Sequence, residues 1–162
     1  MASASNTPNG KSKSGKLHFV IVGGSLGGLA AGIALKALGH DATILERNPT
    51  PLLHDQGAGI VAGGHALEFL KKYNRCKRQE VAVRSDRRQY LDKDGNVVHS
   101  VKGNHDMSSW DLTYYFMRAN FDGTPSDYCD VPSPDPAHGK TVHYHDRNVT
   151  DVVSEGSGVR VY

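Results

Sequence analysis

LHFVIVGGSLGGLAAGIALKALGHDATILER, residues 17–47, contains three successive patterns that decide the fold. Leu17–Val22 has the β-branched content of a buried strand. The next apolar run, Leu26–Leu38, has the spacing of a helix, and Gly39 follows where glycine commonly ends one. Asp41–Glu46 then predicts a second strand that ends in an acid. The stretch therefore predicts the βαβ start of a dinucleotide-binding domain of the α/β class.

The turn between the first strand and the helix is rich in glycine and is the expected ligand site. Gly23 permits a tight turn, and Gly28 lets the helix pack close to the sheet. Between them lie Gly24 and Ser25, and Ser25 takes the place of the second glycine of the usual G-x-G-x-x-G pattern. The N–H groups of the first helical turn would face a pyrophosphate. Glu46 would accept hydrogen bonds from the hydroxyls of the adenosine ribose.

Two other interpretations use the same residues. The apolar run Leu17–Leu38 is long enough to span a bilayer, but its glycines and Lys36 favour a strand and a helix instead. Residues Gly23–Gly27 also satisfy G-x-S-x-G, the nucleophile elbow of α/β-hydrolases, with Ser25 as the nucleophile. Only one strand and a polar tail precede Ser25, whereas an elbow follows several strands. We therefore favour the dinucleotide site.

Composition limits the remaining function classes. The 162 residues carry 19 Lys+Arg against 17 Asp+Glu, and a net charge of +2 does not favour binding to nucleic acid through phosphate neutralisation. Cys76 and Cys129 cannot build a disulfide scaffold, match no zinc or redox spacing, and fit a reducing, cytoplasmic compartment. Residues 1–16 contain no large apolar residue after Met1, so they are expected to form a disordered tail.

Two later motifs point to one family. QGAGI at Gln56–Ile60 and SSWDLTYYFMRANF at Ser108–Phe121 follow the first stretch in a typical order and spacing. Together the three segments resemble the class A FAD-dependent aromatic monooxygenases of the para-hydroxybenzoate hydroxylase type. The GGS form of the first turn is most similar to the dihydroxypyridine hydroxylase branch. The resemblance covers residues 17–162 and implies the N-terminal part of a Rossmann-type FAD-binding monooxygenase domain, truncated relative to the family.

The same resemblance implies FAD as cofactor and NAD(P)H as reductant. With O2, such an enzyme would hydroxylate an aromatic or polyketide-like small molecule, as in secondary metabolism. Glu46 would bind the adenosine ribose, and Arg47 would lie over the adenine or diphosphate. Gly57 and Gly59 would form a turn close to the flavin. Arg118 would contact the cofactor from its helix, although from the sequence alone a solvated cation near the helix C-terminus is the simpler interpretation. No residue is assigned as a catalytic acid or base.

The second half of the chain contains further predicted strands but not every motif of the family's FAD site. Asp94-Gly95 lies between strand-like runs and predicts a β-hairpin, which in the family belongs to a sheet that covers the substrate. Thr141–Tyr162 predicts three short strands. The G-A-D-G and G-D motifs that complete the family's FAD site do not occur in these residues. The alternative is therefore a non-catalytic module that binds FAD or a partner, and an incomplete sheet would leave a strand edge for a complementing chain or for self-association.

The remaining charged and metal-ligating residues have ordinary interpretations. The basic run Lys71–Arg88 is expected to be a solvated helix face, with NADPH phosphates as a hypothetical partner of Arg87 and Arg88. His143 and His145 could be two metal ligands on one strand face. No nearby cysteine or third histidine in the sequence completes such a site, so a metal is not expected.

Overall fold

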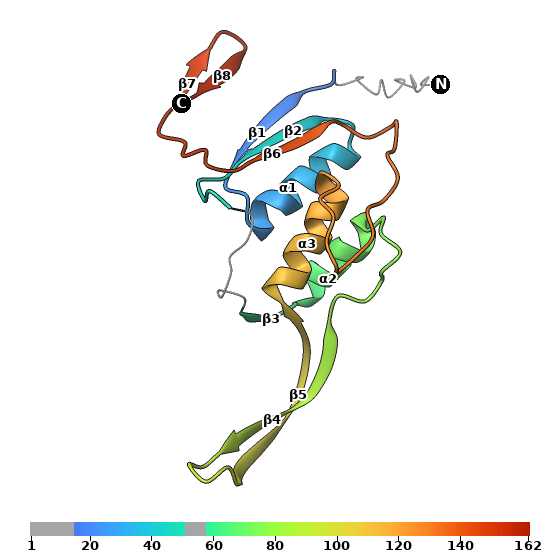
Figure 1. The fold of residues 1–162 in the computed structure, drawn as a ribbon, viewed down its shortest axis with the longest axis vertical. Helices are drawn as coiled ribbons and strands as arrows, with labels where there is room; N and C mark the ends of the chain where they lie inside the picture. Colours follow the sequence, from blue (N-terminus) through green and yellow to red (C-terminus); the bar gives the residue numbers. More distant parts are fainter. Residues whose placement is uncertain (1–14, 51–57) are drawn as a thin grey trace, which may run out of the picture.

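A computed structural model describes residues 15–50 and 58–162 (Figure 1). The first three elements form where the sequence predicts them: β1 (His18–Val22), α1 (Leu26–Ala37) and β2 (Asp41–Leu45). Gly23 and Gly39 have φ angles of 98° and 87°, which favour glycine, and they shape the turns before and after α1. The predicted α/β class and βαβ start are confirmed.

The other elements follow in chain order. They are β3 (Gly59–Val61), α2 (Gly64–Tyr73), β4 (Val83–Leu91), β5 (Val97–Ser109), α3 (Trp110–Phe121), β6 (Thr141–Tyr144), β7 (Val152–Glu155) and β8 (Gly158–Val161). The predicted hairpin is confirmed, with Gly95 at φ 85° in its turn. The three short strands predicted at the end of the chain are confirmed as β6, β7 and β8.

The main sheet has three parallel strands in the order β1–β2–β6. β6 comes from the far end of the chain, so that Thr43 of β2 pairs with Val20 on one side and Val142 on the other. α1 and α3 pack side by side on one face of the sheet (Figure 1). Within the described residues β1 and β6 lie at the two edges of this sheet, and the use of such an edge by a partner or a second copy stays a prediction.

The core lies between this sheet and the helices. Its fully buried large side chains are Leu29 of α1, Ile44 of β2, and Phe116 and Phe121 of α3. Burial of each such side chain contributes about 1.5–3 kcal/mol. Gly32 lets α1 approach α3 closely, because a Cβ at this position would lie 2.6 Å from the Phe121 ring. This packing fixes the start of α1 against the carboxyl ends of β1 and β2.

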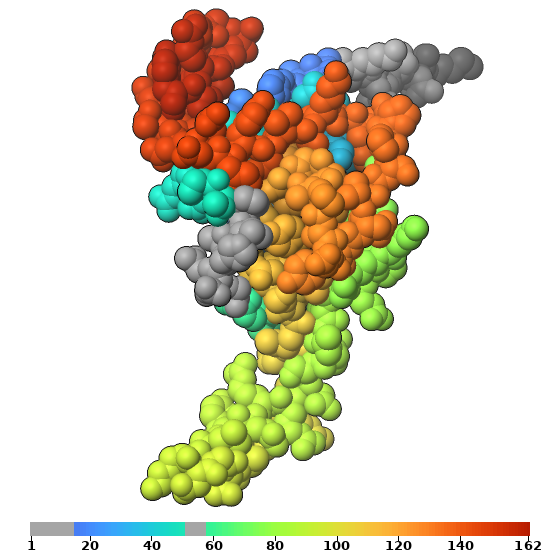
Figure 2. Space-filling model, viewed as in Figure 1, coloured from blue at the N-terminus to red at the C-terminus, as the bar shows by residue number. Residues whose placement is uncertain are grey.

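β4 and β5 form an antiparallel hairpin that projects from the helices (Figures 1 and 2). β3 pairs with the base of β5, which gives a second sheet in the order β3–β5–β4. At the tip of the hairpin, the Asp92 carboxylate accepts the N–H groups of Asp94 and Asn96 at 2.9 Å each. Local turn chemistry therefore specifies this element.

The basic run Lys71–Arg88 is not one helix face, so that prediction is wrong. α2 ends at Tyr73, and the later arginines lie in the connection or in β4. Asn74 has an extended backbone with ψ 129°, and its Nδ2 donates to the Arg78 carbonyl at 2.7 Å. This side chain–backbone bond turns the chain where a further helical turn was expected.

Residues 1–16 are predicted to form a disordered tail, and a membrane segment at Leu17–Leu38 is the alternative that the sequence does not favour. Residues 1–14 of the predicted tail lie outside the described residues, and Lys16 forms an ion pair with Asp41 at 2.8 Å. Across residues 15–50 and 58–162, none of the helices has the length and apolar character that a membrane crossing requires.

Candidate functional site

The glycine turn lies at the carboxyl ends of β1 and β2, where open α/β sheets bind their ligands. The Gly23 N–H donates to the Leu45 carbonyl at 2.8 Å, and the Gly24 N–H donates to Glu46 Oε2 at 2.7 Å. A Cβ on Gly28 would collide with the Gly23 carbonyl oxygen. The packing roles predicted for Gly23 and Gly28 are therefore confirmed, while their role in ligand binding stays a prediction.

Ser25 is the N-cap residue of α1. Its carbonyl accepts the Leu29 N–H at 3.0 Å, which starts the helix. Its side chain makes no capping hydrogen bond, and the first turn of α1 contains no acidic residue. The N–H groups of that turn have no intrahelical partner, and the helix dipole adds positive potential, so this end of α1 suits an anionic ligand.

Glu46 follows β2 and is held by two backbone donors. Oε2 accepts the Gly24 N–H, and Oε1 accepts the Asn48 N–H at 2.8 Å. Burial alone would raise the pKa of Glu46, but these donors and the nearby His143 and His145 lower the pKa overall. The carboxylate is therefore ionised at neutral pH, and each oxygen retains a lone pair for a hydroxyl donor.

A small pocket opens beside this carboxylate. Its lining residues come from the turn, the loop after β2, α3 and the end of β6: Gly24, Ser25, Glu46, Asn48, Thr50, Trp110, Tyr114 and His145. Trp110 and Tyr114 are stacked, with ring centroids 4.6 Å apart and an interplanar angle of 14°. The pocket, about 30 Å³ in volume, thus brings together a carboxylate, a helix N-terminus and an aromatic wall.

Arg118 of α3 is buried, with 5% of its surface exposed. Its guanidinium pairs with Asp122 at 2.8 Å and donates to Tyr114 Oη and Thr124 Oγ1, also at 2.8 Å. Burial alone would lower the pKa of Arg118, but the hydrogen bonds and charge of Asp122 raise it overall. The interpretation of Arg118 as a solvated cation is therefore wrong. Arg118 fixes Tyr114 and thereby the aromatic wall, and its direct contact with a cofactor stays a prediction.

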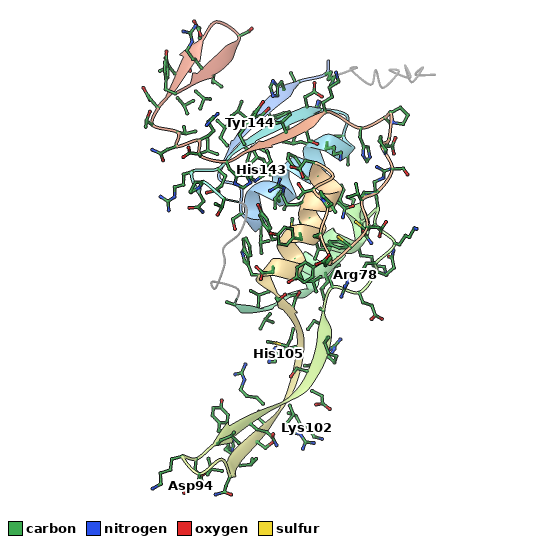
Figure 3. The ribbon with its side chains drawn as sticks, in the orientation of Figure 1. Arg78, Asp94, Lys102, His105, His143 and Tyr144 are labelled. Atoms are coloured by element: carbon green, nitrogen blue, oxygen red, sulfur yellow. The ribbon has the colours of Figure 1, made fainter. Side chains whose placement is uncertain are left out.

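His143 lies in β6 (Figure 3), and His145 follows the end of that strand and lines the pocket. Their rings lie 4.5 Å apart, His145 Nε2 is 3.3 Å from Arg118 Nη1, and His143 Nε2 is 3.5 Å from the Gly24 carbonyl oxygen. Burial and the Arg118 charge lower the pKa of His143 to about 4, so its ring is neutral at pH 7. The sequence indicates these histidines only as possible metal ligands and does not reveal that His143 contacts the turn or that His145 lines the pocket.

The described residues give no geometric support to the metal and hydrolase interpretations. They contain no group of three or more His, Cys, Asp or Glu side chains that could hold a metal ion. Within the same ranges, no histidine forms a hydrogen bond with Ser25, which a nucleophile needs for activation.

The other predicted site residues either lie apart from the turn or fall outside the described residues. Arg47 follows Glu46 and is exposed, and Gly57 lies outside the described residues. Gly59 begins β3, whose next residues line a second pocket of about 500 Å³. That pocket is mostly apolar and includes Leu26 at the start of α1. The structure thus gathers the predicted turn residues and Glu46 in one place and sets Gly59 beside a neighbouring hollow.

The fold and the turn together define the class of protein. A parallel βαβ unit with a helix start over a glycine turn, and an acid at the end of the second strand, is a Rossmann-type dinucleotide-binding arrangement. The family model of the pyridine nucleotide-disulphide oxidoreductases matches residues 18–62, which contain this unit.

More specific relatives are FAD-dependent monooxygenases. FAD-dependent monooxygenase asL4 of Sarocladium schorii is 36% identical over 84 residues, which are 51% of this chain and 19% of the relative. The 2,6-dihydroxypyridine 3-monooxygenase of Paenarthrobacter nicotinovorans is 33% identical over 98 residues, 60% of this chain and 24% of the relative. The chain therefore spans about a fifth to a quarter of these relatives.

A solved structure gives the same comparison in three dimensions. The 2,6-dihydroxypyridine-3-hydroxylase of Arthrobacter nicotinovorans superposes with a TM-score of 0.64 at 24% identity, over 93% of this chain and 33% of that chain. This likeness supports the fold. Together with the sequence relatives, it confirms the predicted resemblance: the chain is similar to the N-terminal part of FAD-dependent monooxygenases.

Proposed function

We propose that these residues bind the ADP half of FAD and form the N-terminal part of an FAD-dependent monooxygenase. The enzyme would use NAD(P)H and O2 to hydroxylate an aromatic or secondary-metabolite substrate. The observation that carries the proposal is the Glu46 carboxylate, held 2.7 Å from the Gly24 N–H beside an uncapped helix N-terminus. The free thiols of Cys76 and Cys129 support a cytoplasmic location as part of the same proposal.

The residues of the pocket fit the parts of this cofactor. The N–H groups at the start of α1 would bind the pyrophosphate, and Glu46 would accept the ribose hydroxyls. Trp110, stacked on Tyr114, would provide a flat apolar wall, and Arg118 would hold that wall in place through Tyr114 Oη. When bound, FAD would supply the redox chemistry with NAD(P)H and O2. The contribution of Arg47 on the adenine or diphosphate side, and those of Gly57 and Gly59 close to the flavin, belong to this proposal as well.

The direct test is flavin retention. The purified chain is incubated with FAD and desalted, and its visible absorption spectrum is recorded. We expect a retained flavin band, and we expect Glu46→Gln to weaken FAD binding about tenfold or more, because the amide loses one acceptor and the charge. Glu68→Gln, at an exposed acid of α2, is the matched control and should bind FAD like the parent chain. A colourless folded protein would reject the proposal, and equal binding by Glu46→Gln would reject the role of Glu46.

A partner-binding module is the second candidate, and the free edge of β1 favours it. Leu17 and Gly23 direct their backbone bonds to β2, so by alternation His18, Val20 and Val22 direct theirs to the open edge. The Val20 and Val22 side chains are also exposed. Light scattering at increasing concentration tests self-association through this edge, and Val20→Pro, which removes an edge N–H, should reverse it. If the protein is monomeric at all concentrations, self-association through this edge is excluded. Co-purification then tests whether a separate complementing chain binds there.

A further inference from the structure

The two cysteines of the chain, distant in sequence, meet in the fold. Cys76 is in the connection after α2 and is 3% exposed, and Cys129 is half-buried in the loop after α3. Cys76 belongs to the buried apolar core, which includes residues of α3, and Cys129 packs against that core. Their separation in the sequence matched no redox pattern, so only the fold reveals the pair.

Both sulfur atoms contact the same part of α3. Asn120 Nδ2 donates to Cys76 Sγ at 3.2 Å and to the Phe116 carbonyl at 2.9 Å. Cys129 Sγ lies 3.9 Å from the carbonyl oxygen of Tyr115, the preceding residue of the same helix. Each thiol is also among the groups that shift the pKa of the other.

Flanking contacts hold the two backbone segments against each other. The Lys77 N–H donates to Asp130 Oδ1 at 2.9 Å, and Arg78 Nη1 donates to the Tyr128 carbonyl at 3.0 Å. These bonds lie beside the cysteines, one and two residues after Cys76 and one residue on either side of Cys129. The thiols are therefore held near each other on both sides, as a pair rather than as two isolated groups.

We propose that Cys76 and Cys129 close to an intramolecular disulfide when the protein meets a hydroperoxide. Cys129 reacts first because it is the more exposed thiol: its sulfur takes one peroxide oxygen, and one water leaves. Cys76 sulfur then displaces the oxygen from the Cys129 sulfenic acid, the S–S bond forms, and a second water leaves. In sum, two thiols and one hydrogen peroxide give one disulfide and two waters, so the sulfurs are oxidised and the peroxide is reduced.

The environment makes this closure slow and sensitive to pH. Burial raises the pKa of the Cys76 thiol to about 12, and burial also raises the pKa of Cys129. Because the thiolate is the reactive form, the rate of closure should rise as pH rises through the range in which the protein is folded. The disulfide would thus link the two loops covalently, and it would form only after prolonged exposure to the oxidant.

The test combines intact mass with thiol counting. The folded chain is treated with hydrogen peroxide, unfolded, and alkylated with N-ethylmaleimide. We expect the parent chain to lose two hydrogen atoms, to take up no alkylating reagent, to remain monomeric and to recover both thiols on reduction. The oxidised chain should also melt on the order of 5–10 °C higher, because the bridge restricts the unfolded state. Three outcomes would each overturn the proposal: a gain of oxygen with no disulfide formed, a covalent dimer, or two thiols that remain free.

Variants separate proximity from simple reactivity. In Cys129→Ser the buried Cys76 should stay reduced while the parent closes, and in Cys76→Ser the remaining Cys129 should gain oxygen. In denaturant the thiols lose the burial that raises their pKa, so the test of pairing is the yield of the disulfide and not its rate. The folded parent chain should give a larger share of disulfide over oxygen addition than the unfolded chain, and equal shares would show that the fold does not pair the thiols.

Discussion

Apolar side chains are buried in the sheet–helix body but exposed in the β4–β5 hairpin. In the body, Leu29 and Phe121 are 0% exposed, because strands and helices from both ends of the chain close over them. In the hairpin, Val83 is 75% and Val98 is 64% exposed. The hairpin projects alone in Figure 2, with Asp94 at its tip in Figure 3. Long-range packing thus specifies the body, whereas a local turn specifies the hairpin.

Charge pairs show the same contrast. Arg118 and Asp122, with side chains 6% and 11% exposed, form an ion pair inside the body. Arg160 and Glu155, at 56% and 57%, pair on the surface of the β7–β8 hairpin. Loss of a partner matters far more where water cannot replace it. Each prediction below sets a change in the body against a matched change where the chain is exposed.

The largest effect is expected at the buried ion pair. Arg118→Met should lower the free energy of unfolding by about 3–5 kcal/mol, because it leaves the Asp122 carboxylate buried without its partner. Arg160→Met should cost about 0–1 kcal/mol. Urea titration followed by circular dichroism measures both values. Similar losses in the two variants would mean that Arg118 is not buried as described.

The second largest effect is expected in the glycine turn, where two adjacent glycines can be compared. Gly28→Ala should lower the free energy of unfolding by about 3 kcal/mol, because the new Cβ meets the Gly23 carbonyl oxygen of the backbone. Gly27→Ala has nothing within 4 Å of its Cβ and should stabilise the helix by about 0.5–1 kcal/mol. Thermal unfolding of both variants gives the sign of each change. Destabilisation by Gly27→Ala would contradict the geometry of the turn.

This turn also shows why part of the fold could be predicted from the sequence. β1, α1 and β2 follow from periodicity and from glycines that act within a few residues, so local sequence contained the information. The addition of β6 beside β2 depends on pairing across about a hundred residues, and no local pattern encodes it. The same is true of His143 at Gly24. Sequence reasoning therefore found the turn and Glu46 but not the histidines and aromatic wall that surround them.

The third effect depends on pH. The folded state holds His143 neutral, with its pKa lowered to about 4 from a usual 6.5. The unfolded chain thus binds a proton more readily between these values, so stability is full above about pH 6.5 and declines as pH falls toward 4. The loss should reach about 2–3 kcal/mol, and His143→Gln should remove most of it. Unfolding curves from pH 7.5 to 4.5 check this, with exposed His99→Gln as control. An unchanged pH profile in His143→Gln would refute the assignment.

The smallest effect is expected on the hairpin, where a null result is informative. Val98→Thr keeps the β-branched shape and removes only exposed apolar surface, so the free energy of unfolding should change by less than about 0.5 kcal/mol. The measurement is made at low and high protein concentration. A cost above about 1 kcal/mol that grows with concentration would show that a second copy covers this face. If the cost is small at both protein concentrations, the exposed valine side chain contributes to neither folding nor self-association. The body then depends on packing between distant parts of the polypeptide, whereas the hairpin depends on its own turn.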